Sequence, residues 1–264
     1  MNTEAFLLEL PGLWDGDPQT ADHPRDRRFQ RVIEATRGMA TENKLALLNL
    51  AAQHMSDGQV YVEVGAWAGC SIIGASLGNR SRQFVTIDDF SEFGGPLVEC
   101  QRNLEQFNAV NVELINGSAW DVLRSTRLPG PVGVYFYDGG HSFVDQYRAF
   151  EYIEPLLADE ALVIIDDTAG PAVADANRLY TRTRPQFERV VVMTSQWSGE
   201  PRWWNGIEVY AFRRERGPGL PPSRFAVWSA RAREVARRMS AWSTLQVRRV
   251  QVRLRRLSAR RSRS

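Results

Sequence analysis

The fold is decided by one stretch, Val60-Tyr61-Val62-Glu63-Val64-Gly65-Ala66-Trp67-Ala68-Gly69-Cys70-Ser71. Its β-branched and aromatic start predicts a buried strand over 59–64, and its end predicts a helix from Ser71. Gly65 allows a sharp turn, and Gly69 allows a ligand or a helix to approach closely. Such a unit directs backbone N–H groups and a positive helix end at one point, beside the carboxylate of Glu63. An ordinary strand-to-helix turn has the same pattern, so the stretch alone leaves both interpretations open.

Strand-like and helix-like segments alternate along most of the chain, whereas residues 1–28 are rich in Asp, Pro and Gly and are expected to be irregular. Further strands are predicted over 83–88, 110–115, 132–138, 161–166, 188–194 and 207–213. Helices are predicted over 29–38, 42–54, 71–77, 98–107, 143–157 and 173–180. The alternation predicts a doubly wound, Rossmann-like α/β fold with a mostly parallel seven-stranded sheet. The last two strands lack a helix between them, so we expect them to pair antiparallel and give the sheet an antiparallel edge.

A change of composition after Arg213 indicates a separate tail. We expect an N-terminal segment over 1–40, an α/β domain over 41–216, and a linker with a basic amphipathic helix over 217–264. Apolar residues of the tail recur at alternating spacings of three and four, as on one face of a helix: Phe225, Trp228, Ala232, Val235, Met239 and Trp242.

The charge of the chain is distributed unevenly. Residues 223–264 hold thirteen arginines and one acid, a net charge of +12 in a chain whose total is +2, so residues 1–222 carry −10. A basic amphipathic helix suits an anionic membrane surface. The alternative left open is that its apolar face packs on the α/β domain or on a second copy in a homo-oligomer. Nucleic acid is not favoured, because the acidic domain repels phosphates.

Composition also bounds the cellular setting. Cys70 and Cys100 are the only cysteines and lack metal-ligand spacing, which predicts a reduced, cytoplasmic location, with peripheral membrane attachment as an open addition. No apolar run reaches about 18 residues, so no membrane span is expected. The segment from Met1 to Leu13 holds two glutamates and no basic residue, unlike a secretory signal.

Acidic or small polar residues follow five of the predicted strands, and ligands of doubly wound sheets bind at these carboxyl ends. They are Glu63 and Gly65, then Asp88-Asp89, Asn116-Gly117-Ser118-Ala119, Asp138-Gly139-Gly140-His141 and Asp166-Asp167. Asp88 lies 19 residues after Gly69, near the spacing at which an acid meets a ribose diol. The small residues from Asn116 to Ala119 can lie flat against an adenine. Each of the two sets has a helix cap as its alternative interpretation.

The carboxylates of Asp138, Asp166 and Asp167 form a second group. Oxygen ligands on adjacent strand ends suit Mg²⁺, which would lower the pKa of a substrate hydroxyl. Helix caps without any metal are the open alternative. His141 follows Asp138 by three residues and can accept a substrate proton near neutral pH, unless it is a solvent-facing residue of the next helix.

With these residues, the chain resembles the class I S-adenosylmethionine-dependent methyltransferases, in particular a bacterial small-molecule O-methyltransferase-like group. The resemblance runs from about Thr41 to Arg213 and rests on 62–71, on Asp138-Gly139-Gly140-His141-Ser142-Phe143 and on the Asp166-Asp167 strand end. It extends to the metal-dependent catechol, caffeoyl-CoA and macrolide-sugar enzymes.

The resemblance implies a role for each strand end. Glu63 and Gly65 would face the methionine part of S-adenosylmethionine, and Ala66 and Gly69 would belong to the same cofactor site, Gly69 through close packing. Asp88 would hold the ribose, and Gly117, Ser118 and Ala119 would line the adenine. Asp138 would serve the cofactor site and, with Asp166 and Asp167, a Mg²⁺ site. His141 is the candidate catalytic base on its own chemistry and not through the resemblance.

Two positions depart from the resemblance. Trp67 stands where many of these enzymes have glycine, so we expect its side chain to point aside and pack. Ala158-Asp159-Glu160 replaces a common Pro-Gly-Gly turn, so the local structure there must differ.

The function expected from these residues is transfer of a methyl group from S-adenosylmethionine to an oxygen of a small molecule such as a sugar or a phenol, with metal assistance as an option. Two alternatives stay open. One is a nucleotide-sugar glycosyltransferase or another nucleotide-dependent α/β enzyme, in which Asp88-Asp89 would bind a metal. The other is a membrane-surface adaptor with a Rossmann-like scaffold. No motif encodes the acceptor.

Overall fold

The computed structural model describes residues 1–125, 127–220, 223 and 225–239 of the chain. Met1–Pro221 forms one compact unit and Pro222–Ser264 forms another. The N-terminal residues therefore share a unit with the α/β residues. The predicted division of the chain at residues 40 and 216 stays a prediction.

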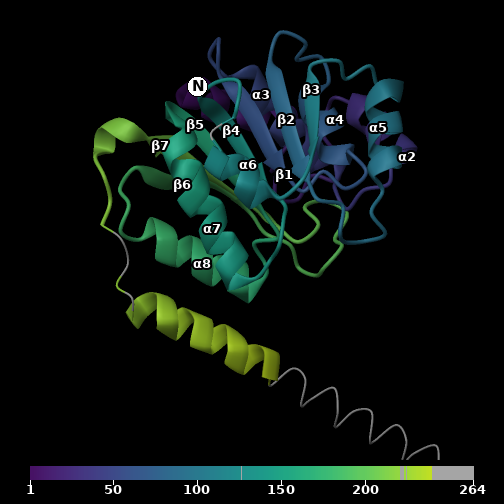
Figure 1. Ribbon diagram of the computed structural model, residues 1–264. Coiled ribbons are helices and arrows are strands. Elements are labelled where there is room, and N and C mark those ends of the chain that lie inside the picture. The colour runs from purple at the N-terminus through teal and green to yellow at the C-terminus, as the bar shows by residue number, and fades with distance from the viewer. Residues whose placement is uncertain (126, 221–222, 224, 240–264) are drawn as a thin grey trace, which may run out of the picture. The chain divides into compact units, whose positions relative to one another are not determined.

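The first unit is built on a seven-stranded sheet with the order β3-β2-β1-β4-β5-β7-β6 (Figure 1). The strands are β1 Val60–Val64, β2 Gln83–Asp88, β3 Val112–Asn116, β4 Val132–Tyr137, β5 Leu157–Asp166, β6 Phe187–Met193 and β7 Ile207–Arg213. All neighbours pair in parallel except β7, which runs antiparallel to both β5 and β6. The predicted α/β fold, its mostly parallel sheet and the antiparallel pairing of the last two strands are confirmed. The strand order reverses between β1 and β4, where a ligand crevice is expected.

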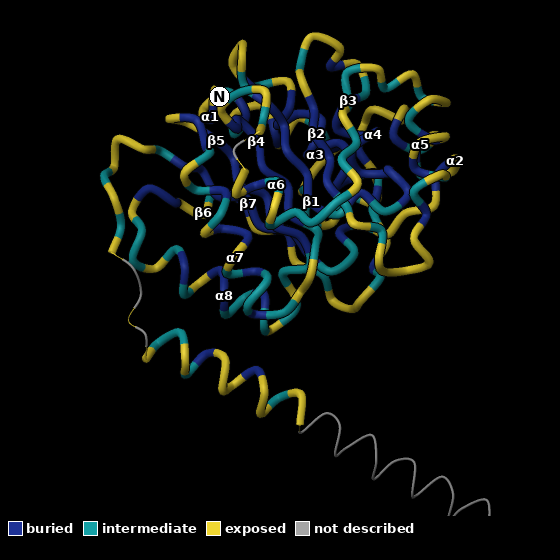
Figure 2. Tube along the Cα trace, in the orientation of Figure 1, coloured by how far each residue is buried: buried dark blue, intermediate teal, exposed yellow. Residues whose placement is uncertain are grey.

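Helices cover both faces of this sheet (Figure 1). They are α1 Thr3–Glu9, α2 Arg28–Ala35, α3 Glu42–Gln53, α4 Cys70–Ser76, α5 Leu97–Gln106, α6 Ala119–Ser125, α7 Phe143–Ile153 and α8 Pro171–Thr181, with short 3-10 turns η1 Leu10–Leu13, η2 Glu154–Leu156 and η3 Arg214–Arg216. One apolar cluster joins the sheet to α1, η1, α3 and α4, and a second joins the opposite face to α6, α7 and α8. Figure 2 shows the central strands buried and the edge strand β3 only partly buried.

The N-terminal segment is more ordered than its composition predicts. Residues 1–28 were expected to be irregular, but the structure has helix α1, whose N-terminus is capped by the side chain of Asn2. The expectation is wrong because Phe6, Leu10 and Trp14 recur every fourth residue and enter the core formed with α3. The Trp14 indole N–H also donates to Asn43 Oδ1 at 2.7 Å. A sparse apolar stripe therefore outweighs the Asp, Pro and Gly around it.

The element boundaries differ most from the predictions between α7 and β5. The helix expected to reach residue 157 ends at Ile153, because Pro155 turns the chain into η2. Strand β5 begins at Leu157, so Ala158-Asp159-Glu160 is extended chain rather than a turn. Glu160 already pairs with Arg213 of β7. The departure from a Pro-Gly-Gly turn is thus explained by a longer strand.

The described part of the second unit is a helix over residues 225–239. It contains the predicted apolar positions from Phe225 to Met239, and Trp242 lies outside the described residues. Among the described residues, no helix combines the length and the hydropathy needed to cross a bilayer.

Candidate active site

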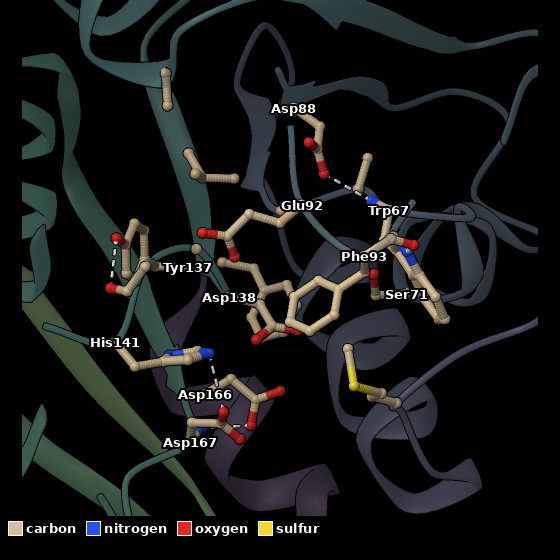
Figure 3. Close-up of a pocket in the computed structure, with 18 of the residues that line it drawn as sticks. Trp67, Ser71, Asp88, Glu92, Phe93, Tyr137, Asp138, His141, Asp166 and Asp167 are labelled. Carbon is tan, nitrogen blue, oxygen red and sulfur yellow. Dashed lines mark hydrogen bonds and ion pairs between the residues drawn. The ribbon is translucent and has the colours of Figure 1, made fainter. Parts of the chain in front are cut away.

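A cavity of about 720 Å³ opens at the carboxyl ends of the parallel strands. Its lining includes predicted site residues from five strand ends: Gly65, Ala66, Asp88, Gly117, Ser118, Ala119, Asp138, His141, Asp166 and Asp167. Glu63 and Gly69 do not line it. Figure 3 shows Asp88 beside Trp67, and Asp166 and Asp167 beside His141, with Glu92 and Asp138 between them.

Gly65 occupies the reversal point of the sheet. Its φ of 101° lies in the left-handed region, and a Cβ on this residue would lie 2.2 Å from the carbonyl oxygen of Asp138. The Asp138 N–H donates to the carbonyl of Val64 at 2.9 Å. The ends of β1 and β4 therefore touch at this point, and only glycine fits there. Gly69 instead packs against helix α5, because its Cβ would lie 3.2 Å from Cys100 Sγ.

Glu63 supports the cavity from beneath. Its carboxylate is fully buried, and Oε1 accepts hydrogen bonds from Ser71 Oγ at 3.0 Å and Thr86 Oγ1 at 3.2 Å. Burial raises its pKa to about 8. Oε2 has no hydrogen-bond partner in the described part of the chain. Glu63 thus ties the start of α4 to β2, with one buried oxygen left over for a polar group.

Asp88 connects the turns after β1 and β2. Its Oδ2 accepts the backbone N–H of Trp67 at 2.8 Å, and its Oδ1 accepts the backbone N–H of Phe90 at 2.7 Å. Two backbone bonds fix the direction of the carboxylate, and each oxygen keeps a lone pair toward the cavity. The neighbouring Asp89 bonds to Ser91 Oγ and does not join a metal-type cluster within the described residues.

Trp67 has φ 41°, the left-handed backbone conformation that glycine adopts most easily. As expected, its side chain packs aside. The indole N–H donates to the carbonyl of Phe93 at 3.3 Å, and the Arg37 guanidinium lies 5.1 Å from the ring centre. The turn therefore keeps a glycine-like backbone although it carries a large side chain.

The turn after β3 offers an open surface beside Asp88. Gly117 donates its N–H to the Asp88 carbonyl at 2.9 Å, and a Cβ on Gly117 would meet no atom within 4 Å. Ser118 Oγ accepts only weakly from the Asp121 N–H, at 3.4 Å. Gly117, Ser118 and Ala119 thus leave room for a flat group.

His141 and Asp167 form a direct pair on the other side of the cavity (Figure 3). His141 Nε2 lies 3.0 Å from Asp167 Oδ2. Burial lowers the pKa of His141, but the carboxylates around it, Asp167 first and then Asp166 and Glu92, more than offset this, and the net change is a raised pKa. Burial likewise opposes the charge of Asp167, yet the contact with His141 holds the pKa of Asp167 below its ordinary value. Burial, with the charge of Asp166, raises the pKa of Asp138.

Asp166 is committed to a partner that sequence reasoning missed. Its Oδ1 pairs with Nζ of Lys44, a buried residue of α3, and also accepts the Asp167 backbone N–H at 2.7 Å. Burial raises the pKa of Asp166, and the Lys44 ammonium opposes that rise. Lys44 is the single lysine of the sequence and lies on the helix with the wide apolar face of Leu45, Leu47, Leu48 and Leu50, a signal that could have identified it.

Asn205 is the second residue that was missed. Its side chain hydrogen-bonds to the carboxylate of Asp167 and lowers the pKa of that group. It follows Trp204 in the loop between β6 and β7, and both residues line the cavity. Asp167 has φ 56°, so this carboxylate is held by side chains around a left-handed backbone.

The N-terminal segment holds this loop in place. Trp203 is buried against Trp14, with 5.6 Å between ring centres, and its indole N–H donates to the Pro18 carbonyl at 2.9 Å. Thr41, the N-cap of α3, donates through Oγ1 to the Arg202 carbonyl at 2.7 Å. Residues 14–41 therefore help to place Trp204 and Asn205.

Three groups in the cavity fit a metal ion by distance. Ligand atoms of Asp138, His141 and Asp167 lie within 4.8 Å of one another. Two carboxylates and one imidazole are a suitable donor set for a divalent cation. The set predicted from the sequence contained Asp166 in place of His141, and the contact with Lys44 gives Asp166 a different partner.

Comparison with known proteins identifies the class. Residues 62–168 match the model of a methyltransferase domain. An O-methyltransferase of tomaymycin synthesis from Streptomyces achromogenes, solved with S-adenosylmethionine, shares the fold at 18% identity with a TM-score of 0.55, over 81% of this chain and 99% of the other. An O-methyltransferase from Bacillus cereus, solved with S-adenosylhomocysteine, matches at 16% identity and a TM-score of 0.54, over 72% and 92%. No curated protein sequence matches significantly.

The match and the topology confirm the predicted class. Residues 62–168 match a methyltransferase domain, and the sheet has the mostly parallel topology predicted for the S-adenosylmethionine-dependent class. The similar structures, at these identities, speak for the fold alone.

Proposed function

We propose that the chain transfers the methyl group of S-adenosylmethionine to an oxygen of a small-molecule acceptor. The observation that carries the proposal is the His141–Asp167 pair, which lines the same cavity as the Gly65 turn. A proton acceptor and a cofactor turn in one cavity are what methylation of a hydroxyl requires. The acids of the cavity also suit a cationic sulfonium.

The cofactor fits the half of the cavity formed by β1, β2 and β3. Gly65 and Ala66 line the cavity where its methionine part would lie, and Asp88 is oriented to accept from ribose hydroxyls. The open surface at Gly117, Ser118 and Ala119 suits the adenine. Glu63 and Gly69 do not line the cavity and support it indirectly. Glu63 bonds to Ser71 of α4, and Gly69 packs on α5.

The cofactor supplies a methyl group on a sulfonium that an oxygen nucleophile can displace in line. The chain has to align the acceptor and remove its proton. If Nε2–H of His141 donates to Asp167, Nδ1 is left as the proton acceptor. The Asp167 carboxylate then stabilises the imidazolium, and Asn205 and the backbone contact with Asp166 hold that carboxylate.

A divalent cation is the second way in which the same atoms could assist. Asp138, His141 and Asp167 would hold it, and it would polarise the acceptor hydroxyl. The Lys44 ammonium already supplies a positive charge next to the Asp166 carboxylate. We therefore expect direct proton transfer from the acceptor hydroxyl to His141 to be sufficient without a metal ion.

Aromatic residues suggest the acceptor class. Phe93 and Trp204 line the cavity, and Phe93 is 66% exposed. Ring faces of this kind can stack on a phenol or cover the C–H face of a sugar.

A methyl-transfer assay over a panel of phenols and sugars tests the proposal, with S-adenosylhomocysteine as the measured product. Each acceptor is offered with a chelator and with added Mg²⁺. We expect turnover that survives the chelator and is lost in His141→Ala, with His23→Ala as the matched control because His23 is exposed outside the cavity. Turnover that strictly requires Mg²⁺ would assign the three groups to a metal. Full turnover in His141→Ala would contradict a role for this residue.

A further inference from the structure

The helix over residues 225–239 presents a stripe of large apolar side chains. Phe225, Trp228, Val235 and Met239 are 73%, 65%, 56% and 67% exposed. At about 100° per residue they fall, with Ala232, within an arc of about 80°. The rings of Phe225 and Trp228 lie 6.0 Å apart, centre to centre. The four residues form one continuous surface, named here the tail stripe.

The opposite side of this helix is the covered one. Ala230 and Glu234 are 0% and 8% exposed, and at about 100° per residue they point away from the tail stripe. An amphipathic helix that packs on a protein core buries its apolar stripe. An exposed, continuous apolar surface of this kind marks an interaction site.

Charge indicates what that partner is. Arg231 and Arg238 flank one edge of the tail stripe, and Arg238 pairs with Glu234 at 2.6 Å. The sequence from 223 to 264 carries +12, against −10 in the residues before it. Two such tails repel each other, which disfavours a second copy as the partner. Nucleic acid would attract the arginines but leave the tail stripe in water.

We propose that this helix lies in the surface of an anionic lipid membrane. The tail stripe enters the boundary between headgroups and acyl chains, where Trp and Phe rings are favoured. The arginines stay among the anionic headgroups. The helix lies along the membrane and does not cross it, in agreement with the lack of a spanning helix among the described residues.

Vesicle flotation of the full chain tests this proposal. We compare vesicles of phosphatidylcholine alone with vesicles that also contain phosphatidylglycerol. The wild-type chain is expected to float with the anionic vesicles, to stay behind with the neutral ones, and to release as salt is raised. The Phe225→Ser/Trp228→Ser variant is expected to lose at least about tenfold in partitioning.

Trp197→Ser is the matched control, because Trp197 is 56% exposed but belongs to the first unit. It should float as the wild-type chain does. Circular dichroism and calorimetry with S-adenosylmethionine, which should be unchanged in all variants, separate this proposal from the methyltransferase assignment.

Three results would overturn the proposal. The first is a wild-type chain that does not float, or that binds neutral vesicles equally well. The second is a double variant that floats like the wild-type chain. The third is binding to another partner: either the wild-type chain sediments as a dimer and the double variant as a monomer, or the chain binds RNA tightly and does not float.

Discussion

The two halves of the cavity are built in different ways. The half at β1, β2 and β3 is made largely by backbone: the left-handed turn at Gly65, the N–H groups that hold Asp88, and the open turn at Gly117. The half at β4 and β5 is made by side chains from distant segments. Lys44 reaches Asp166 across 122 residues of chain, and Asn205 reaches Asp167 from the loop before β7. The first half depends on the shape of the backbone, whereas the second depends on charged side chains that neutralise one another.

The largest effect is expected in the side-chain half at His141. His141→Ala removes the proton acceptor, and turnover should fall about 10²- to 10⁴-fold, as for the loss of a general base. Affinity for S-adenosylmethionine should stay unchanged, because the backbone half is intact. Steady-state kinetics with an acceptor from the panel, together with calorimetry, measure the two quantities. A parallel loss of cofactor affinity would show that the halves are not separable.

The buried ion pair should give the next effect. Lys44→Met leaves the Asp166 carboxylate buried without its cation and should lower the free energy of unfolding by about 3–5 kcal/mol. Adding Asp166→Asn removes that charge, so the double variant should regain much of the loss. Urea unfolding of the wild-type chain and the three variants completes the cycle. If the loss in the double variant equals the sum of the two single losses, the charges do not interact as described.

Gly65 tests the backbone half. Gly65→Ala places a Cβ 2.2 Å from the Asp138 carbonyl oxygen and should reduce cofactor affinity about 100-fold, or roughly 2.7 kcal/mol. Gly58→Ala is the matched control, because Gly58 also has a positive φ, 77°, but its Cβ would meet no atom within 4 Å. Isothermal titration calorimetry measures the cofactor affinity of both variants. Equal affinities would mean that close contact between β1 and β4 does not shape the site.

The smallest effect concerns pH. Asp167 raises the pKa of His141, so turnover should rise with pH through a midpoint above the ordinary histidine value of about 6.5. Asp167→Asn should move this midpoint to lower pH. The same pair has the opposite effect on stability: its contribution is complete below the unfolded pKa of histidine and is lost as pH rises through the folded one. A pH–rate midpoint that does not move in Asp167→Asn would separate His141 from proton transfer.

The same contrast explains how much of the molecule the sequence could predict. Val60 to Ser71 encodes a strand, a turn and a helix within twelve residues, and the alternation that follows is enough for the sheet. Asp88 and Asp138 are at strand ends, where local pattern places them. Lys44, Asn205 and the apolar residues Phe6, Leu10 and Trp14 contact residues that are far away in the sequence. Nothing near them in the sequence therefore reveals their partners. For the same reason Asp166 was expected beside a metal, whereas it lies on Lys44.

Binding of S-adenosylmethionine to the wild-type chain tests the central claim most directly. Isothermal titration calorimetry should show one site with a Kd of about micromolar size, competition by S-adenosylhomocysteine, and no competition by NAD or a UDP-sugar. A folded chain that gives no heat with S-adenosylmethionine, or that binds NAD or a UDP-sugar in its place, would contradict the account.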